Sequence, residues 1–154
     1  MKKIIISIVI GLSLFSCQSE NRVYSENQEL SPEVEWLKSD VKTFKVKIDD
    51  ILSSYNQTIF FRYAEGFSSK SLNVKVTEIS PSNKTTVEHF ELIVVDENGE
   101  YIGEPAVSIW DSEHLVAKSK KFNEKGTYTF IFEPETPKQK VDFAMEIGLA
   151  FDKN

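Results

Sequence analysis

Hydrophobic and polar positions alternate along most of the chain beyond residue 40. In three segments apolar side chains take every second position, as expected of half-buried β-strands, at 44–48, 72–76 and 128–132. Residues 58–63 and 90–95 are apolar on both faces over much of their length, which is typical of strands that are covered on both sides. Arg62 is the one charge within the first of these segments. A further short strand is predicted at 106–110, after Pro105.

The longest alternation lies near the C-terminus, where apolar residues take every second position from Val141 to Phe151. The intervening positions include Ala144, Gly148 and Ala150, which are too small to fill an ordinary solvent-facing surface. We therefore expect another element or a partner to pack closely against Ala144 and Ala150. A bend is expected at Gly148, because glycine in a strand weakens its regularity.

Turn-forming residues separate these segments, and no stretch shows a convincing amphipathic helical pattern. The turns include Ser80–Asn83 and Asp96–Gly99, the second of which ends in an Asn-Gly pair. Seven to nine short strands with such spacing predict an all-β protein, an antiparallel β-sandwich formed by residues 36–154. A jelly-roll-like arrangement is one option, and the pattern leaves the strand order open.

The N-terminal segment has a different pattern. Two lysines precede a twelve-residue apolar run at 4–15, which as a helix would cover about 18 Å and so is too short to span a bilayer core of about 30 Å. Residues 1–16 are therefore predicted to be a cleaved signal peptide. Leu14–Cys17 resembles a bacterial lipobox, so the only cysteine of the chain, Cys17, is expected to carry a diacylglyceryl group and an N-acyl chain.

Residues 17–35 are predicted to form the lipidated cysteine and a flexible polar tether. Removal of the signal peptide leaves 138 residues with 16 basic and 24 acidic side chains, a net charge of −8. Such an acidic surface argues against nucleic acid and anionic headgroups as partners, since both need a basic patch. Gln18 after the cysteine favours the outer membrane, and the sequence leaves open whether the protein faces the periplasm or the cell surface.

Few residues offer catalytic or metal chemistry. His89 and His114 lie 25 residues apart without metal-ligand spacing, and no nucleophile elbow, P-loop or dinucleotide motif is present. We expect no metal, no cofactor beyond the covalent lipid, and no small-molecule substrate. Carboxylates are numerous, so a pair acting as in glycosidases stays a formal hypothesis.

Five residues are candidates for an interaction surface. Arg62 could bind an anionic partner, although an arginine among aromatic side chains more often pairs with a carboxylate. Trp110 and Asp111 lie where an aromatic ring could stack on a sugar or anchor a protein contact, although a core position is the more common role of such a tryptophan. Ala144 and Ala150 complete the set.

An ordered series of motifs spans residues 36–153 and gives the chain a family resemblance. The series is Asp49-Asp50, Tyr55-Asn56, Arg62, Asp96-x-Asn98-Gly99-x-Tyr101-Ile102-Gly103, Ile109-Trp110-Asp111, Phe122, Gly126-Thr127-Tyr128-Thr129-Phe130 and Ile147-Gly148-Leu149. With the lipobox, it resembles the gliding-motility lipoprotein GldH family of Bacteroidota. The resemblance implies an envelope lipoprotein linked to gliding and to type IX secretion, with other envelope proteins as partners and no enzymatic activity.

Two hypotheses follow from the sequence. In the first, the protein is a membrane-anchored, non-enzymatic β-sandwich that acts by protein contact in the gliding and secretion apparatus. In the second, it is a surface carbohydrate-binding module, as aromatic richness on a sandwich suggests.

Overall fold

The structure is a computed structural model that describes residues 21–154, so the predicted signal peptide 1–16 and Cys17 lie outside the described residues. Residues 21–154 form eleven strands and no helix, and hence no helix that is long and apolar enough to cross a membrane. The strands are β1 (Arg22–Glu29), β2 (Glu35–Leu37), β3 (Lys42–Ile48), β4 (Tyr55–Ala64), β5 (Ser71–Ile79), β6 (Thr85–Ile93), β7 (Glu104–Ala106), β8 (Ile109–Lys120), β9 (Gly126–Pro134), β10 (Lys140–Asp142) and β11 (Ala144–Lys153).

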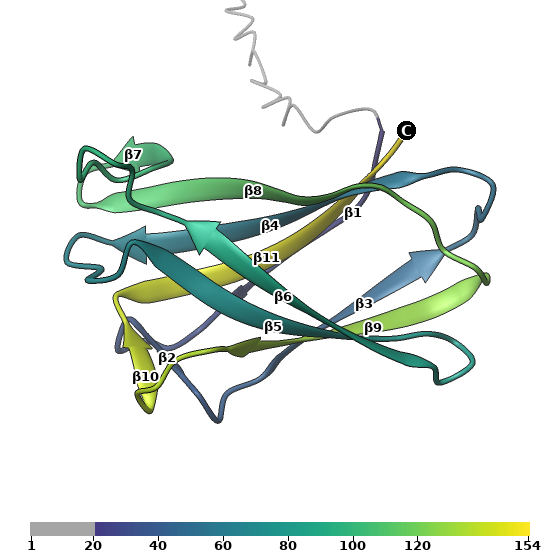
Figure 1. Ribbon diagram of the computed structural model, residues 1–154, viewed down its shortest axis with the longest axis horizontal. Coiled ribbons are helices and arrows are strands. Elements are labelled where there is room, and N and C mark those ends of the chain that lie inside the picture. The colour runs from purple at the N-terminus through teal and green to yellow at the C-terminus, as the bar shows by residue number, and fades with distance from the viewer. Residues whose placement is uncertain (1–20) are drawn as a thin grey trace, which may run out of the picture.

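Two antiparallel sheets face each other, which confirms the predicted β-sandwich (Figure 1). One sheet has the order β1-β11-β4-β8-β7 and the other the order β3-β9-β5-β6, while β10 and β2 form a small separate ribbon. The eight longer strands form four antiparallel pairs, in which the first strand along the chain pairs with the last, the second with the second last, and so on. The pairs are β1 with β11, β3 with β9, β4 with β8 and β5 with β6. This pairing of the first four strands with the last four in reverse order is a jelly roll.

The space between the sheets is filled by the apolar positions that the alternation predicts. Phe44, Val46 and Ile48 of β3 are fully buried, as are Phe130 and Phe132 of the neighbouring strand β9. Phe44 and Phe132 meet edge to face with ring centroids 4.9 Å apart, a geometry that aromatic pairs prefer.

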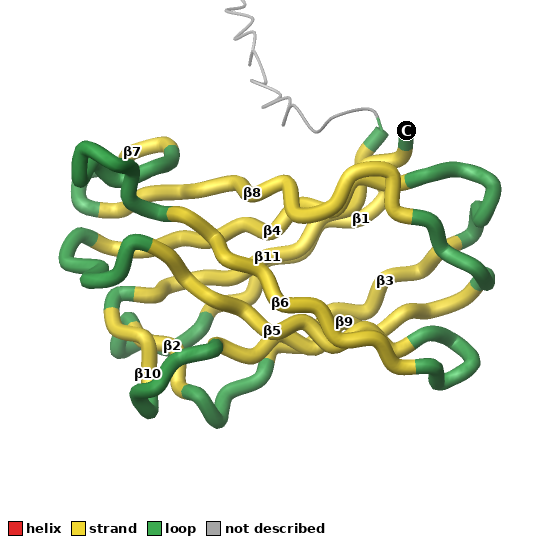
Figure 2. The backbone as a smooth tube through the Cα atoms, viewed as in Figure 1, coloured by secondary structure: helices red, strands yellow, loops and turns green. Residues whose placement is uncertain are grey.

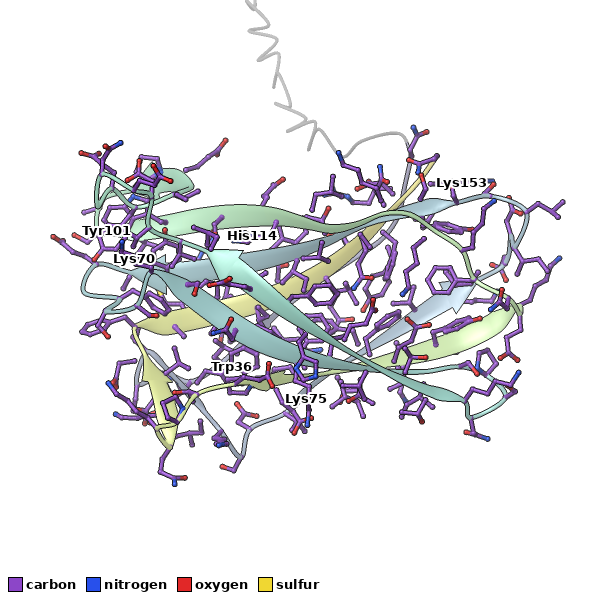
Figure 3. All side chains as sticks on the ribbon, viewed as in Figure 1. Trp36, Lys70, Lys75, Tyr101, His114 and Lys153 are labelled. Atoms are coloured by element: carbon purple, nitrogen blue, oxygen red, sulfur yellow. The ribbon has the colours of Figure 1, made fainter. Side chains whose placement is uncertain are left out.

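Two further side chains add to the packing of the sandwich, Trp36 and Lys120. Trp36 of β2 is fully buried, and its indole Nε1 donates to the carbonyl oxygen of Asp40 at 2.7 Å (Figure 3). Lys120 of β8 reaches across to the other sheet, where its Nζ lies 2.8 Å from Glu78 Oε2 and 3.3 Å from Glu88 Oε2. The second contact links the two sheets by charge.

The predicted flexible tether is wrong over most of its length, because Arg22–Glu29 forms β1 and pairs with β11 at the edge of the five-stranded sheet. The sequence conceals this strand because it is an edge strand with mostly polar, exposed side chains. The folded domain therefore includes Arg22–Glu29, whereas it was predicted to start at residue 36.

Strand β8 was predicted only at its start, and it runs on to Lys120. Its pairing with β4 shifts register near Gln57, so the side chains of β8 do not alternate cleanly between the faces of the sheet. The total of eleven strands in residues 21–154 exceeds the predicted seven to nine, and three of them, β2, β7 and β10, are only three residues long.

The predicted eleven-residue strand at the C-terminus is also interrupted. Phe143 has a φ of 64° and separates β10 from β11, and a register shift follows between Ala144 and Glu146. As a result Ala144 lies in the hydrophobic core, whereas it was expected on the outward face.

The loops gather at the two ends of the sandwich (Figure 2). The loops β3–β4, β5–β6 and β8–β9 lie at the end where β1 begins and β11 finishes, as the register of Arg22 opposite Asp152 and of Lys153 opposite Tyr55 requires. The β4–β5 loop and the β7–β8 turn lie at the opposite end. We call these the N-terminal end and the far end of the domain.

Candidate functional site

A groove of about 270 Å³ lies on the outer face of the five-stranded sheet. It is lined by side chains from β1, β11, β4 and β8, among them Arg22, Asn27, Phe60, Arg62, Asp111, Glu113, Glu146 and Gly148. Gly148 helps to make the hollow, because a Cβ at this position would collide with the side chain of Asn27 on the neighbouring strand. We call this depression the outer-sheet groove.

Arg62 binds two carboxylates at one end of the outer-sheet groove. It lies on β4 directly opposite Asp111 of β8 and Glu146 of β11. Its Nε and Nη2 donate to the two oxygens of Asp111 at 2.6 and 3.0 Å, and its Nη1 donates to Glu146 Oε1 at 2.6 Å. The hydrogen bonds to Asp111 are the main reason that the pKa of Arg62 is raised above its usual value.

This cluster is only partly shielded from water. The side chains of Arg62, Asp111 and Glu146 are 38%, 46% and 23% exposed. Ion pairs of such exposure add little to stability, on the order of 1 kcal/mol or less each. The cluster therefore serves to hold a defined arrangement of charge at the surface.

A second arginine lies in the same groove. Arg22 of β1 pairs with Asp152 of β11 at 3.0 Å, and its guanidinium lies 5.5 Å from the ring centroid of Phe60. The sequence pattern gave no sign of a role for Arg22, because it lies in the polar segment that was predicted to be a tether. Glu113 of β8 adds a third acidic side chain to the groove and is exposed.

The structure separates the five residues that the sequence singled out. Arg62 and Asp111 come together as an ion pair, and Ala150 shares their face of the sheet, although it is fully buried beside Ser25 and Thr58 on the neighbouring strands. Trp110 packs on the inner side of the sheet, with its ring centroid 4.5 Å from that of Tyr101 and 6.2 Å from that of Tyr63. Ala144 lies in the core.

Trp110 thus packs against the core, as the more common role of such a residue suggested. Among the exposed large hydrophobic residues of 21–154, only Phe143 is aromatic, at 41% exposure. A sugar-stacking platform would need exposed rings, and the aromatic side chains that suggested one are mostly packed inside.

His89 and His114 do not form a common site, because each contacts different residues. The Nδ1 atom of His89 on β6 lies 2.9 Å from Glu135 Oε2. His114 on β8 has its Nε2 3.0 Å from Ser112 Oγ, and burial lowers its pKa (Figure 3). Within residues 21–154, no group of three or more His, Cys, Asp or Glu side chains is arranged to hold a metal ion.

Asp111 and Glu146 are the carboxylate pair of the outer-sheet groove. Both bind the same guanidinium, so the Arg62 side chain occupies the space between them where a scissile bond would have to lie. This geometry offers no support for a two-carboxylate hydrolase.

Comparison with models of known protein families shows the family of this chain. A family model described as GldH lipoprotein matches residues 22–151, which is almost the whole of the described domain and includes β1. The protein is thus an all-β envelope lipoprotein, and it belongs to the GldH lipoprotein family. No curated protein and no solved structure matches it significantly.

Proposed function

We propose that this protein is a non-enzymatic, lipid-anchored envelope protein that acts by protein contact in the gliding-motility and type IX secretion apparatus. The family match over residues 22–151 carries the proposal. In this account Cys17 bears the lipid and fixes the protein at the membrane, for which the outer membrane is the favoured location. The covalent lipid is the only non-protein group that the account requires.

The outer-sheet groove is the contact surface that we propose for a protein partner. It presents Asp111, Glu113 and Glu146 against two arginines, each of which already pairs with a carboxylate. Acidic side chains arranged in a hollow favour a basic segment of the partner, because complementary charge guides association and fixes the register of the contact. Glu113 makes the most accessible contribution, since it is exposed and the cation on which its charge acts, Arg22, is already bonded to Asp152.

A deletion strain complemented with variants tests this function. We expect deletion to abolish colony spreading and the wild-type gene to restore it, whereas Glu113→Lys should fail to restore it because it reverses the charge of the groove. Glu97→Lys makes the same change in the exposed far-end loop and should restore spreading fully. Normal spreading in the deletion strain would refute the proposed function, and full rescue by Glu113→Lys would refute only the contact surface.

A further inference from the structure

The start of β1 sets a short distance between the domain and the membrane. Only four residues separate Cys17 from Arg22. A fully extended chain spans at most about 3.6 Å per residue, so the five steps from Cys17 to Arg22 cover no more than roughly 18 Å. If Cys17 is lipidated, as the proposed function assumes, the domain has to lie close against the bilayer surface.

The same geometry makes the N-terminal end of the domain the part nearest the bilayer. The N–H of Lys153 donates to the carbonyl oxygen of Asn21 at 2.8 Å, and Lys153 Nζ lies 2.7 Å from Asp50 Oδ2. Through Lys153, these contacts join the segment just before β1 to the β3–β4 loop. Figure 3 shows Lys153 at this end of the domain and Lys70 and Tyr101 at the far end. The twelve residues of β8 separate the two ends by about 40 Å.

The β3–β4 loop presents an apolar side chain at this end. Leu52 is 86% exposed, the largest exposure of any leucine among the exposed hydrophobic residues. The loop is held in place by Asp50, whose side chain accepts hydrogen bonds from the backbone N–H of Leu52 at 2.9 Å and from the Ser53 hydroxyl at 2.8 Å. Leu52 is therefore projected from an ordered loop.

Three lysines lie in loops at the same end of the domain as this leucine. Lys121 Nζ donates to the carbonyl oxygen of Leu52 at 3.1 Å, and Lys84 and Lys125 lie in the two neighbouring loops. The acids Asp49 and Asp50 are each paired, with Lys47 at 3.1 Å and with Lys153 at 2.7 Å. Glu124, in the same loop as Lys121 and Lys125, accepts a hydrogen bond from the Ser82 hydroxyl at 2.7 Å and interacts electrostatically with Lys84. The three loops at this end thus hold three lysines and three acids. An exposed leucine with lysines at the same end of the domain suits the boundary between acyl chains and anionic headgroups.

The rest of the surface does not share this character. The loops of the far end hold seven acidic residues and three lysines: Glu33, Asp40, Glu65, Asp96, Glu97, Glu100 and Glu135, with Lys38, Lys70 and Lys138. The outer-sheet groove is acidic as well. The net charge of −8 thus conceals an uneven distribution, and the expectation that the whole surface avoids anionic headgroups does not extend to the N-terminal end.

We infer that the N-terminal end of the domain is a membrane-docking surface, in which Leu52 inserts at the bilayer interface and Lys84, Lys121 and Lys125 contact anionic phospholipid headgroups. In this orientation the far end points away from the bilayer and the outer-sheet groove stays accessible from the side. The inference rests on the proposed lipid anchor and adds the orientation of the domain.

Site-specific labels on the lipidated full-length protein test the orientation. Because the only native thiol is that of Cys17, Leu52→Cys and Val107→Cys each supply one free thiol for an environment-sensitive fluorophore. Val107 is fully exposed at the far end and is the matched control. In vesicles of phosphatidylethanolamine with some phosphatidylglycerol, we expect the label at 52 to be shielded from an aqueous quencher and reached by a bilayer-bound one, while the label at 107 stays in water.

A charge reversal then tests the role of the lysines. Lys121→Glu changes the local charge by two units, and at about fivefold per unit it should lower the ratio of docked to undocked domains roughly 25-fold. Lys70→Glu makes the same change at the far end and should leave the shielding of the label at 52 unchanged.

Vesicle flotation of the same samples separates the two proposals. Protein that floats but shows equal aqueous quenching at 52 and 107 overturns the docking surface and leaves the anchor intact. Shielding at 107 in place of 52 overturns it as well. Protein that fails to float overturns the lipid anchor itself, and with it the docking surface that rests on it.

Discussion

Gln57 is the residue whose replacement has the clearest expected effect on stability. It lies on the inward side of β4, opposite Phe151 of β11 and Ala117 of β8, and it is fully buried. Neither its Nε2 nor its Oε1 has a hydrogen-bond partner within residues 21–154. A buried amide without partners loses its hydration and gains nothing in return, at a cost of roughly 1–3 kcal/mol.

Gln57→Met keeps the length of the side chain and removes both polar atoms. We therefore expect this variant to be more stable than the wild type by about 1–3 kcal/mol. For a domain of this size, the midpoint of thermal unfolding should then rise by roughly 4–12 °C. Circular dichroism during thermal and urea unfolding of the mature protein in mild detergent would measure both quantities.

Gln139→Met provides the matched control, because Gln139 lies exposed in the loop between β9 and β10. Its free energy of unfolding should change by less than about 0.5 kcal/mol. A loss of 1 kcal/mol or more in Gln57→Met would mean that the amide is satisfied in the folded protein, and it would refute the reasoning.

Three further substitutions test the outer-sheet groove and the β3–β4 loop. Gly148→Ala should destabilise the protein by about 1–3 kcal/mol in urea unfolding, because the new Cβ displaces Asn27; an unchanged midpoint would contradict the close packing. Arg62→Met should cost about 1 kcal/mol by the same assay, since two carboxylates lose their shared counter-ion, and a gain in stability would contradict this. The pKa of Asp50 is lowered chiefly by its hydrogen bond with Lys153, so the free energy of unfolding should be larger for the wild type than for Asp50→Asn. This difference should be full above about pH 5 and shrink as the pH falls below about 4, and a pH-independent difference would contradict it.

The sequence predicted the inner layer of the fold well, because burial on one face of a strand leaves a period of two. Phe44, Val46 and Ile48 are buried as that period requires. The same reasoning failed at β1, whose exposed edge imposes no such period, and at Phe143, where a positive φ interrupts the alternation. Edge strands and bulges are decided by pairing with distant residues, which local patterns do not record.

The site was predicted less completely for the same reason. Arg62 and Asp111 are 49 residues apart in the chain, and Arg62 and Glu146 are 84 apart. Their meeting depends on the register of β4 with β8 and with β11, which alternation alone leaves undetermined. The sequence therefore identified Arg62 and Asp111 as separate candidates without showing that they form one cluster.

The location of the protein at the membrane through Cys17 is the central claim, and Cys17→Ser tests it most directly. In a deletion strain expressing this variant, the account predicts a folded protein that leaves the membrane fraction and a colony that fails to spread. Colony spreading at the wild-type level by a strain whose Cys17→Ser protein is absent from the membrane fraction would contradict the account.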